Sequence, residues 1–364
     1  MIKLSDRARC CGCSACADAC PHGAIAMEAD GMGFRYPRVD EALCTNCGLC
    51  EKICAFKAQK DPFLPLSVEA IRFPGLRDCS QSGGLAFALM LKAVREGMVV
   101  YGAAMAGDFS VGHVRVETEE ALEPLRLSKY VQSDTTGIPA QVLGDLKAGR
   151  KVLFTGTPCQ CAGIGSIAGK YRENLILMDI ICHGVPAPAV WKDFIASRSQ
   201  KVTKALFRDP SLGWHDHRET LWYGERKEVT DNYTFLFYRN IMLRPSCGVC
   251  PFASLHRPSD ITAGDCWGMD KARDDNMGWS VMLVNTLEDE AFTRDFGKEN
   301  ERFPIDTEKL LQPNLHAPTV LHQHSKAFER TFLKGGYPGV ERRFGRDSLE
   351  YRTEQFIKKV KRHI

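Results

Sequence analysis

The sequence lacks a hydrophobic run that is long enough to cross a membrane. Its most apolar stretch, Leu175 to Cys182, is short and contains Asp179, whereas a transmembrane helix needs about 20 consecutive apolar residues. A strong excess of positive charge is missing too, because the formal net charge is only +3 and nucleic-acid binding normally requires a concentrated basic surface. We therefore expect a protein that neither spans a membrane nor binds nucleic acid.

A secretory signal is also missing from the stretch Met1 to Ile25. The chain nevertheless contains 16 cysteines among 364 residues, and secreted disulfide scaffolds are usually much shorter. We expect the thiols to be reduced and metal-binding, and the protein to be cytoplasmic. The length suggests two or three domains, and a hydrophobic content of 44% is enough to bury their cores.

A repeated cysteine pattern dominates the N-terminal stretch. The spacing C-x-x-C-x-x-C-x-x-x-C occurs twice between Cys10 and Cys54. In two-cluster bacterial ferredoxins, three closely spaced thiolates bind one 4Fe-4S cluster and the fourth ligates the other cluster. The expected ligands of the first cluster are Cys10, Cys13, Cys16 and Cys54. The expected ligands of the second cluster are Cys20, Cys44, Cys47 and Cys50.

Structural zinc is the alternative for these thiols. Zinc sites usually combine paired C-x-x-C knuckles separated by a longer spacer, and a third cysteine at the same short spacing has no role in a tetrahedral site. Cys11 is an extra thiol, and Ala55 follows the second copy where Pro21 follows the first, but neither departure removes a ligand. The spacing therefore favours two iron-sulfur clusters.

The chain divides into four expected segments. Residues 1–58 form a two-cluster ferredoxin-like domain, whose folding should depend on its clusters because the segment is small. A proline-containing connector follows at 59–75, then a larger domain at 76–340 and a basic helical tail at 341–364. The cations of the tail either complement the helix dipole or form a docking patch for an acidic electron carrier. They are Lys358, Lys359, Lys361, Arg362 and His363.

The larger domain shows strand-like stretches separated by helix-like ones, which predicts an α/β sheet. We expect strands at Met98 to Met105, Lys151 to Thr155 and Leu175 to Ile181, and a helix at Leu85 to Glu96. Cys159 and Cys182 follow the ends of two of these strands, where ligands of such sheets collect.

Two further stretches of this domain bear on its fold and site. The polar turn Arg77 to Gly84 opens the expected helix and suits a phosphate at its free N–H groups. An ordinary N-cap at Ser82 explains the same turn equally well. The aromatic run Tyr233 to Tyr238 is expected to be buried as strand-forming rings.

Six motifs occur in one order after residue 65. They are SQSGG (80–84), SKYVQS (128–133), GTPCQ (156–160), CHGVP (182–186), RPSCGVC (244–250) and SDITAGD (259–265). Together they resemble the beta subunit family of coenzyme F420 hydrogenases and dehydrogenases, in the branch with an N-terminal ferredoxin domain that is widespread in anaerobic bacteria. The resemblance implies an α+β fold, in which a bacterial-ferredoxin-like domain with two 4Fe-4S clusters precedes an α/β flavin-binding domain.

The resemblance also implies bound FAD and a third 4Fe-4S cluster. Its matched motif thiols are Cys159, Cys182, Cys247 and Cys250, with Cys161 or Cys266 as the first substitutes. Without the resemblance, the C-x-x-C pair that ends at Cys250 also fits half of a zinc knuckle. The other two thiols also fit buried cysteines without a ligand.

Flavin contacts are expected from three of the motifs. The implied cofactor-binding residues are Ser82, Gly83 and Gly84 at the pyrophosphate, together with Ser128, Lys129, Tyr130, Gly156 and Thr157. Lys129 would place a cation near the flavin N1 and favour the reduced anion, and a surface salt bridge is its alternative role. His183 would donate a proton in catalysis or orient a loop by hydrogen bonding.

These expectations combine into one function. Clusters carry single electrons, organic acceptors usually need two, and a flavin converts between the two modes. We expect an iron-sulfur flavoprotein oxidoreductase that works with ferredoxin or a partner subunit on one side and a small-molecule or deazaflavin acceptor on the other. The alternatives are an electron-transfer subunit without a substrate of its own and a non-redox protein with structural metals.

Overall fold

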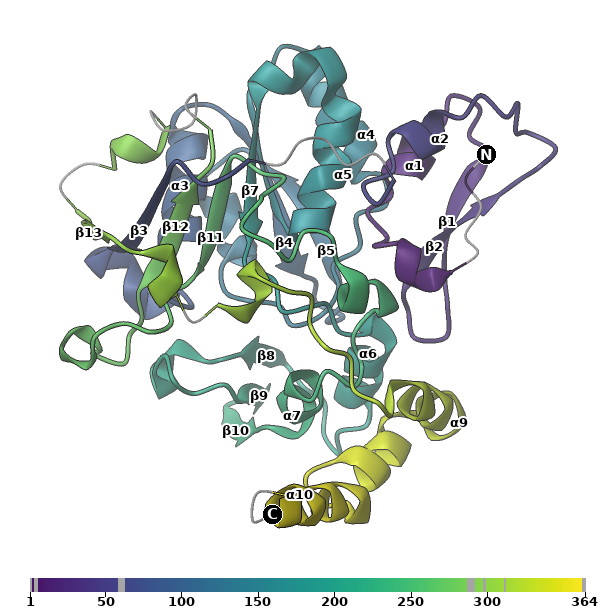
Figure 1. Cartoon of the computed structure of the whole chain (residues 1–364), viewed down its shortest axis with the longest axis vertical. Coiled ribbons are helices and arrows are strands. Elements are labelled where there is room, and N and C mark those ends of the chain that lie inside the picture. Colours follow the sequence, from purple (N-terminus) through teal and green to yellow (C-terminus); the bar gives the residue numbers. More distant parts are fainter. Residues whose placement is uncertain are drawn as a thin grey trace.

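The computed structural model describes residues 2, 6–57, 63–286, 292–296, 299–310 and 312–361. Figure 1 shows a small N-terminal domain beside a large central sheet, with a second lobe of strands and helices below that sheet. Pro62 of the expected connector and Arg362 and His363 of the expected tail lie outside the described residues.

The N-terminal domain contains two short antiparallel strands, β1 (Ile25–Ala29) and β2 (Arg35–Val39). Short helices flank them, namely η1 (Arg7–Arg9), α1 (Ala15–Asp18) and α2 (Leu49–Lys52). The buried core is small, because the side chains of Ile25 and Met27 pack mainly against cysteines. Such a core fits a domain whose stability depends on bound metal.

The large sheet has eight strands among the described residues, in the order β13-β3-β12-β11-β7-β6-β4-β5. They are β3 (Ser67–Arg72), β4 (Val99–Met105), β5 (Val111–Val116), β6 (Val152–Gly156), β7 (Leu175–Ile180), β11 (Ile261–Asp265), β12 (Ser280–Val284) and β13 (Glu301–Pro304). The central strands β4, β6, β7 and β11 are parallel, and the outer pairs are antiparallel. Because β6 and β7 are parallel neighbours, the segments that follow them leave the sheet at the same edge.

Helices cover both faces of this sheet (Figure 1). α3 (Leu85–Arg95) packs on one face, and α4 (Ile138–Lys147) and α5 (Pro158–Ala168) pack on the other. Burial on both faces explains why the central strands are apolar along their length. The connections include the 3-10 helices η2 (Pro74–Cys79), η3 (Glu120–Leu125), η4 (Gly169–Asn174), η5 (Pro210–Leu212), η6 (Pro245–Val249), η7 (Lys271–Arg273), η8 (Thr307–Lys309) and η9 (Pro313–Leu315).

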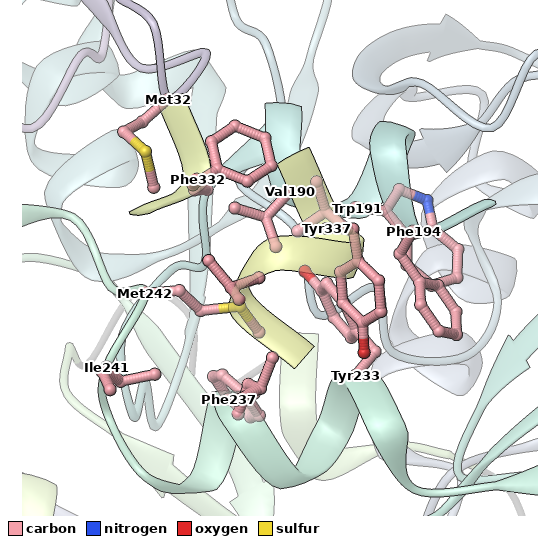
Figure 2. Close-up of a cluster of buried hydrophobic side chains, with 14 of the residues drawn as sticks. Met32, Val190, Trp191, Phe194, Tyr233, Phe237, Ile241, Met242, Phe332 and Tyr337 are labelled. Carbon is pink, nitrogen blue, oxygen red and sulfur yellow. The ribbon is translucent and has the colours of Figure 1, made fainter. Parts of the chain in front are cut away.

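The second lobe has a core of aromatic side chains. It contains the antiparallel strands β8 (Lys204–Phe207), β9 (Glu219–Tyr223) and β10 (Arg226–Thr230) and the helices α6 (Pro188–Ala196), α7 (Asn232–Tyr238), α9 (Ser325–Phe344) and α10 (Leu349–Lys361). The ring of Trp191 lies 4.5 Å from that of Phe207 and 4.9 Å from that of Tyr233, between centroids. Met32 of the N-terminal domain joins the same core, so this lobe anchors that domain (Figure 2).

The expected α+β class is confirmed, but two local expectations are wrong. Ser67–Arg72, placed in the connector, is strand β3 inside the large sheet, because the nearby prolines bound the strand without interrupting it. Tyr233 to Tyr238 lies in helix α7 and is not a strand. Its buried residues Tyr233, Leu236 and Phe237 have the spacing of one helix face.

The tail expected from residue 341 is helical, since α9 extends into it and α10 follows. Among the described residues, no helix combines the length and the apolar character of a membrane span.

Candidate electron-transfer site

The first cysteine set, Cys10, Cys13, Cys16 and Cys54, comes together in the N-terminal domain. Burial raises the pKa of Cys16, and the neighbouring Cys13, Cys10 and Cys54 add to the rise. Burial also raises the pKa of Cys10, with smaller contributions from Cys13 and Cys54. Thiolates this close repel one another unless they share a metal centre, because like charges disfavour the ionised form.

The second set, Cys20, Cys44, Cys47 and Cys50, lines a separate pocket in the same domain. The backbone N–H of Ile2 donates to the Sγ of Cys50 at 3.3 Å. Cys47 is exposed, whereas no cysteine of the first set is. The second set therefore lies nearer the protein surface than the first.

The third set, Cys159, Cys182, Cys247 and Cys250, lines one pocket beside the large sheet. β6 leads into Cys159 in the first turn of α5, and β7 leads into Cys182. Cys247 lies on η6, and Cys250 directly follows this helix. Burial raises the pKa of Cys182, and repulsion from the other three thiols adds to the rise. The structure thus brings together the four thiols that the sequence motifs selected.

Cys11 joins the first set to the third. Its buried thiol lines the pocket of the third set and packs in one cluster with Cys13 and Cys159, and its Sγ donates to the carbonyl oxygen of Cys159 at 3.9 Å. The neighbouring thiol of Cys11 lowers the pKa of Cys159 to about 7. In the sequence Cys11 is only an extra thiol, and the adjacent pair Cys10-Cys11 is the sole signal of its position.

The two substitute ligands lie elsewhere. Cys161 is on α5, but its Sγ donates to the carbonyl oxygen of Met178, 3.6 Å away, within the buried face of the sheet. Cys266 packs in a different core with Trp279 and Val281. Neither cysteine lines the pocket of the third set.

The donor set at this junction fits an iron-sulfur centre. The thiols of Cys11, Cys13, Cys159 and Cys250 share one apolar cluster with the rings of Phe56 and Phe252 and with two alanines. Fe–S clusters are held by thiolates in such surroundings, whereas Ca²⁺ and Mg²⁺ require oxygen ligands. The third pocket therefore offers the chemistry that a cubane needs.

The segments expected to bind flavin also meet in space. The N–H of Ser128 donates to Gln81 Oε1 at 3.4 Å, and Gln81 Nε2 donates to the carbonyl of Arg208 at 2.8 Å. The hydroxyl of Ser82 donates to the carbonyl of Trp279 at 2.7 Å. These contacts join the SQSGG and SKYVQS motifs to each other and to the second lobe.

The two glycines of the SQSGG motif hold the turn against the sheet. A Cβ atom on Gly83 would collide with the backbone of Ile71 and Ser280. Gly84 is the N-cap of α3 and has a φ of +89°, which L side chains rarely adopt. The Oγ of Ser80 is buried and has no hydrogen-bond partner within the described part of the chain.

Lys129 is half-buried and forms no surface salt bridge within the described ranges. Its Nζ donates to the carbonyl of Arg126 at 2.7 Å, and no carboxylate in the described ranges forms an ion pair with it. Burial lowers the pKa of Lys129 to about 7. The amine therefore changes its charge close to neutral pH.

Tyr130 faces the aromatic side chains of α7. Its ring stacks on that of Phe237 with centroids 4.7 Å apart, and its Oη accepts a hydrogen bond from the hydroxyl of Tyr238 at 3.3 Å. Gly156 and Thr157 lie instead at the start of α5. Thr157 caps that helix with Gln160, and its Oγ1 is 3.3 Å from the Sγ of Cys159.

His183 lies between the third cysteine set and these aromatic rings. It lines the pocket of the third set, its Nε2 is 2.6 Å from Asn240 Oδ1, and its ring meets that of Phe237 at 5.2 Å. Burial lowers the pKa of His183. The neutral imidazole therefore has a fixed orientation, with an Nε2–H that donates to the amide oxygen.

Comparisons with known proteins identify both parts of the chain. Residues 149–305 match the family model for the C terminus of the beta subunit of coenzyme F420 hydrogenase/dehydrogenase, and residues 9–58 match that of a 4Fe-4S dicluster domain. An uncharacterized ferredoxin of Methanocaldococcus jannaschii is 38% identical over 55 residues, which cover 15% of this chain and 70% of that protein.

A solved structure of the F420-reducing nickel-iron hydrogenase complex from Methanosarcina barkeri also aligns with the chain. The alignment has 15% sequence identity and a TM-score of 0.49, and it covers 76% of this chain and 96% of that chain. The assignment depends on the two family matches and not on this likeness. The chain therefore carries the C-terminal domain of the coenzyme F420 hydrogenase/dehydrogenase beta subunit family at residues 149–305 and an N-terminal 4Fe-4S dicluster domain at residues 9–58.

Proposed function

We propose that this protein is an iron-sulfur flavoprotein oxidoreductase that passes electrons between 4Fe-4S clusters and a two-electron acceptor through bound FAD. The observation that carries the proposal is the position of Cys11, which packs against Cys13 of the first set and Cys159 of the third and donates to the carbonyl oxygen of Cys159. Electron transfer requires such close approach of the centres. The three cysteine sets are therefore assigned as ligands of three clusters.

We infer the order in which electrons pass through the three cysteine sets from the exposure of their cysteines. The second set contains the exposed Cys47 and is placed where ferredoxin or a partner subunit delivers electrons. The first set contacts Cys11 and connects the second set to the third. His183 and the rings of Phe237 and Tyr238 lead from the third set to Tyr130, so the flavin is placed beyond them.

Three residues near the SQSGG motif support the flavin assignment. The hydroxyl of Ser80 has no hydrogen-bond partner among the described residues and lies in the turn that leads into α3, where a phosphate finds free N–H groups. Lys129 is a half-buried amine without a carboxylate partner in the described ranges, and Tyr130 offers an aromatic face. FAD would supply the conversion between one-electron and two-electron transfer, while these residues bind its phosphates and set the charge beside its ring.

Anaerobic purification followed by iron, sulfide and flavin analysis tests this proposal. Three cubanes and one flavin predict about twelve iron atoms and one FAD per chain. About eight iron atoms with the flavin retained would refute the third cluster alone, and zinc without flavin would refute the whole proposal. Reduction of a small acceptor by the purified chain would exclude the alternative of an electron-transfer subunit without its own substrate.

A further inference from the structure

One buried cation at the junction of the cysteine sets has no carboxylate partner among the residues that the structure describes. Arg244 is 0% exposed, and its guanidinium donates to neutral oxygens. The acceptors are the carbonyls of Cys10 and Arg35, both at 2.8 Å, and Gln132 Oε1 at 2.9 Å. Arginine stays protonated in proteins, so a full positive charge is buried here.

The other buried arginines of the described chain differ from Arg244. Each forms an ion pair with an aspartate, namely Arg77 with Asp275, Arg208 with Asp265 and Arg257 with Asp179. Burial of an unpaired charge carries a large desolvation cost. The anion that compensates Arg244 must therefore come from something other than a carboxylate.

The groups beside Arg244 that can supply this anion are cysteine thiols, which are thiolates when they ligate iron. The Nη2 of Arg244 is 3.8 Å from the Sγ of Cys10, and Arg244 lines the pocket of the third set together with Cys159 and Cys247. A single cation therefore faces thiolates of both sets. In clusters held by these thiolates the negative charge remains, because a cubane with four thiolate ligands is an anion and becomes more negative on reduction.

The guanidinium is fixed in this position. It lies over the ring of Tyr36 at 4.3 Å and over that of Phe34 at 5.3 Å. A Cβ atom on Gly12 would lie only 2.9 Å from its Nη1. Gln132 is held in turn, because its Nε2 donates to the carbonyl of Cys11 at 2.8 Å. Aromatic rings, backbone and an amide thus keep the charge in place without neutralising it.

We propose that Arg244 is the counter-cation of the junction and raises the reduction potential of the cluster held by Cys10. This inference rests on the proposed function. Arg244 binds no iron in it and acts on the electron only through its fixed positive charge. The step is a one-electron reduction of the cluster in which Arg244 neither gains nor loses a proton. In a buried setting of low dielectric the fixed charge stabilises the added electron more than it would in water.

Redox titration of the iron-replete chain, followed by electron paramagnetic resonance, tests the inference. Arg244→Gln removes the charge and keeps a hydrogen-bonding side chain. We expect one cluster to show at least a tenfold lower ratio of reduced to oxidised form at a fixed potential. This change corresponds to a reduction potential that is lower by about 59 mV for a one-electron couple. Arg244→Lys should restore most of this ratio, because it keeps the charge.

A matched control and a second variant separate charge from structure. Arg198 also stacks on aromatic rings, Phe194 and Tyr337, and donates to a carbonyl, so Arg198→Gln should leave every potential unchanged. Gln132→Glu keeps Arg244 but gives it a carboxylate, and it should lower the same potential.

Two outcomes would overturn the inference. One is an unchanged set of potentials in an iron-replete Arg244→Gln or Gln132→Glu protein. The other is loss of iron from both of these variants and from Arg244→Lys, which would show that Arg244 only holds the fold together. A wild-type chain with about eight iron atoms would instead refute the third cluster of the proposed function. The effect on the cluster of Cys10 would remain measurable in that protein.

Discussion

A Cβ atom on Gly163 would lie 2.7 Å from the Sγ of Cys13. Gly163 belongs to α5 of the sheet domain, whereas Cys13 belongs to the first cysteine set. Cys159 lies one turn earlier on the same helix, and residues four apart share one helix face. One face of α5 therefore places the thiol of Cys159 in the third set and, at Gly163, leaves room for the side chain of Cys13 of the first set. This packing, together with Cys11, explains how the centres of two domains approach each other.

Gly163→Ala should disturb the first cluster. The added methyl group must displace Cys13, because the contact is too short to be accommodated, even though alanine favours a helix over glycine by about 1 kcal/mol. We expect a loss of up to about four iron atoms per chain, measured by iron analysis and electron paramagnetic resonance. Gly144→Ala on α4 is the control, because nothing lies within 4 Å of its added Cβ. Full iron content with an unchanged spectrum in Gly163→Ala would contradict this packing.

Cys182→Ser should remove the third cluster alone. Its thiol lies with those of Cys159, Cys247 and Cys250, and a serine hydroxyl is a poor substitute for a thiolate ligand. We expect the iron content to fall from about twelve to about eight atoms per chain, while the spectrum of the N-terminal clusters persists. Cys79→Ser, at a thiol whose neighbour is the carbonyl of Leu76, should keep all the iron. An unchanged count in Cys182→Ser would show that this thiol is not a ligand.

The sequence was most informative where the chemistry is local. The repeated spacing between Cys10 and Cys54 assigned eight thiols to one small domain, and the dicluster family match confirms that assignment at the level of the domain. The thiols of the third set are far apart in the sequence and meet only because β6 and β7 are parallel neighbours. Resemblance to a family, and not spacing, selected them.

Other features could not be predicted because they depend on tertiary contacts. The roles of Cys11 and Arg244 follow from the approach of two domains, which no local pattern encodes. The run Tyr233 to Tyr238 is aromatic throughout, so that its alternation was too weak to distinguish a strand from the helix α7 that the aromatic core stabilises. Strand β3 was missed because the prolines on either side of it predicted a connector.

Lys129→Met should reduce the flavin content of the purified protein. The substitution keeps an apolar stem of similar length and removes the half-buried amine, whose charge would balance an anionic group of the cofactor. We expect the flavin-to-protein ratio to fall severalfold, measured by absorbance after release of the flavin, with the iron content unchanged. Lys147→Met, at an exposed position of α4, should retain the flavin. An unchanged ratio in Lys129→Met would remove this residue from the flavin site.

Glu219 should make the stability of the second lobe depend on pH. This residue of β9 is 0% exposed, and burial raises its pKa to about 7. Its carboxyl group accepts the N–H groups of Tyr233 and Thr234 at 2.9 and 3.1 Å, at the start of α7. The unfolded pKa of a glutamate is about 4.3, so the folded protein holds the proton more tightly. Its stabilising contribution is therefore complete below about pH 4.3 and is lost as the pH rises through about 7.

The apparent thermal midpoint of the holoprotein, measured without oxygen at pH 5.5 and at pH 8, tests this linkage. We expect the wild-type midpoint to fall between these two values of pH, because the folded state must then ionise a buried carboxyl group. Glu219→Gln cannot ionise and should show a smaller fall, while its amide oxygen still accepts a backbone N–H. Glu225→Gln, at an exposed position of the adjacent turn, should behave like the wild type. If Glu219→Gln lost as much stability as the wild type over this range, the pH dependence would have to arise from other groups.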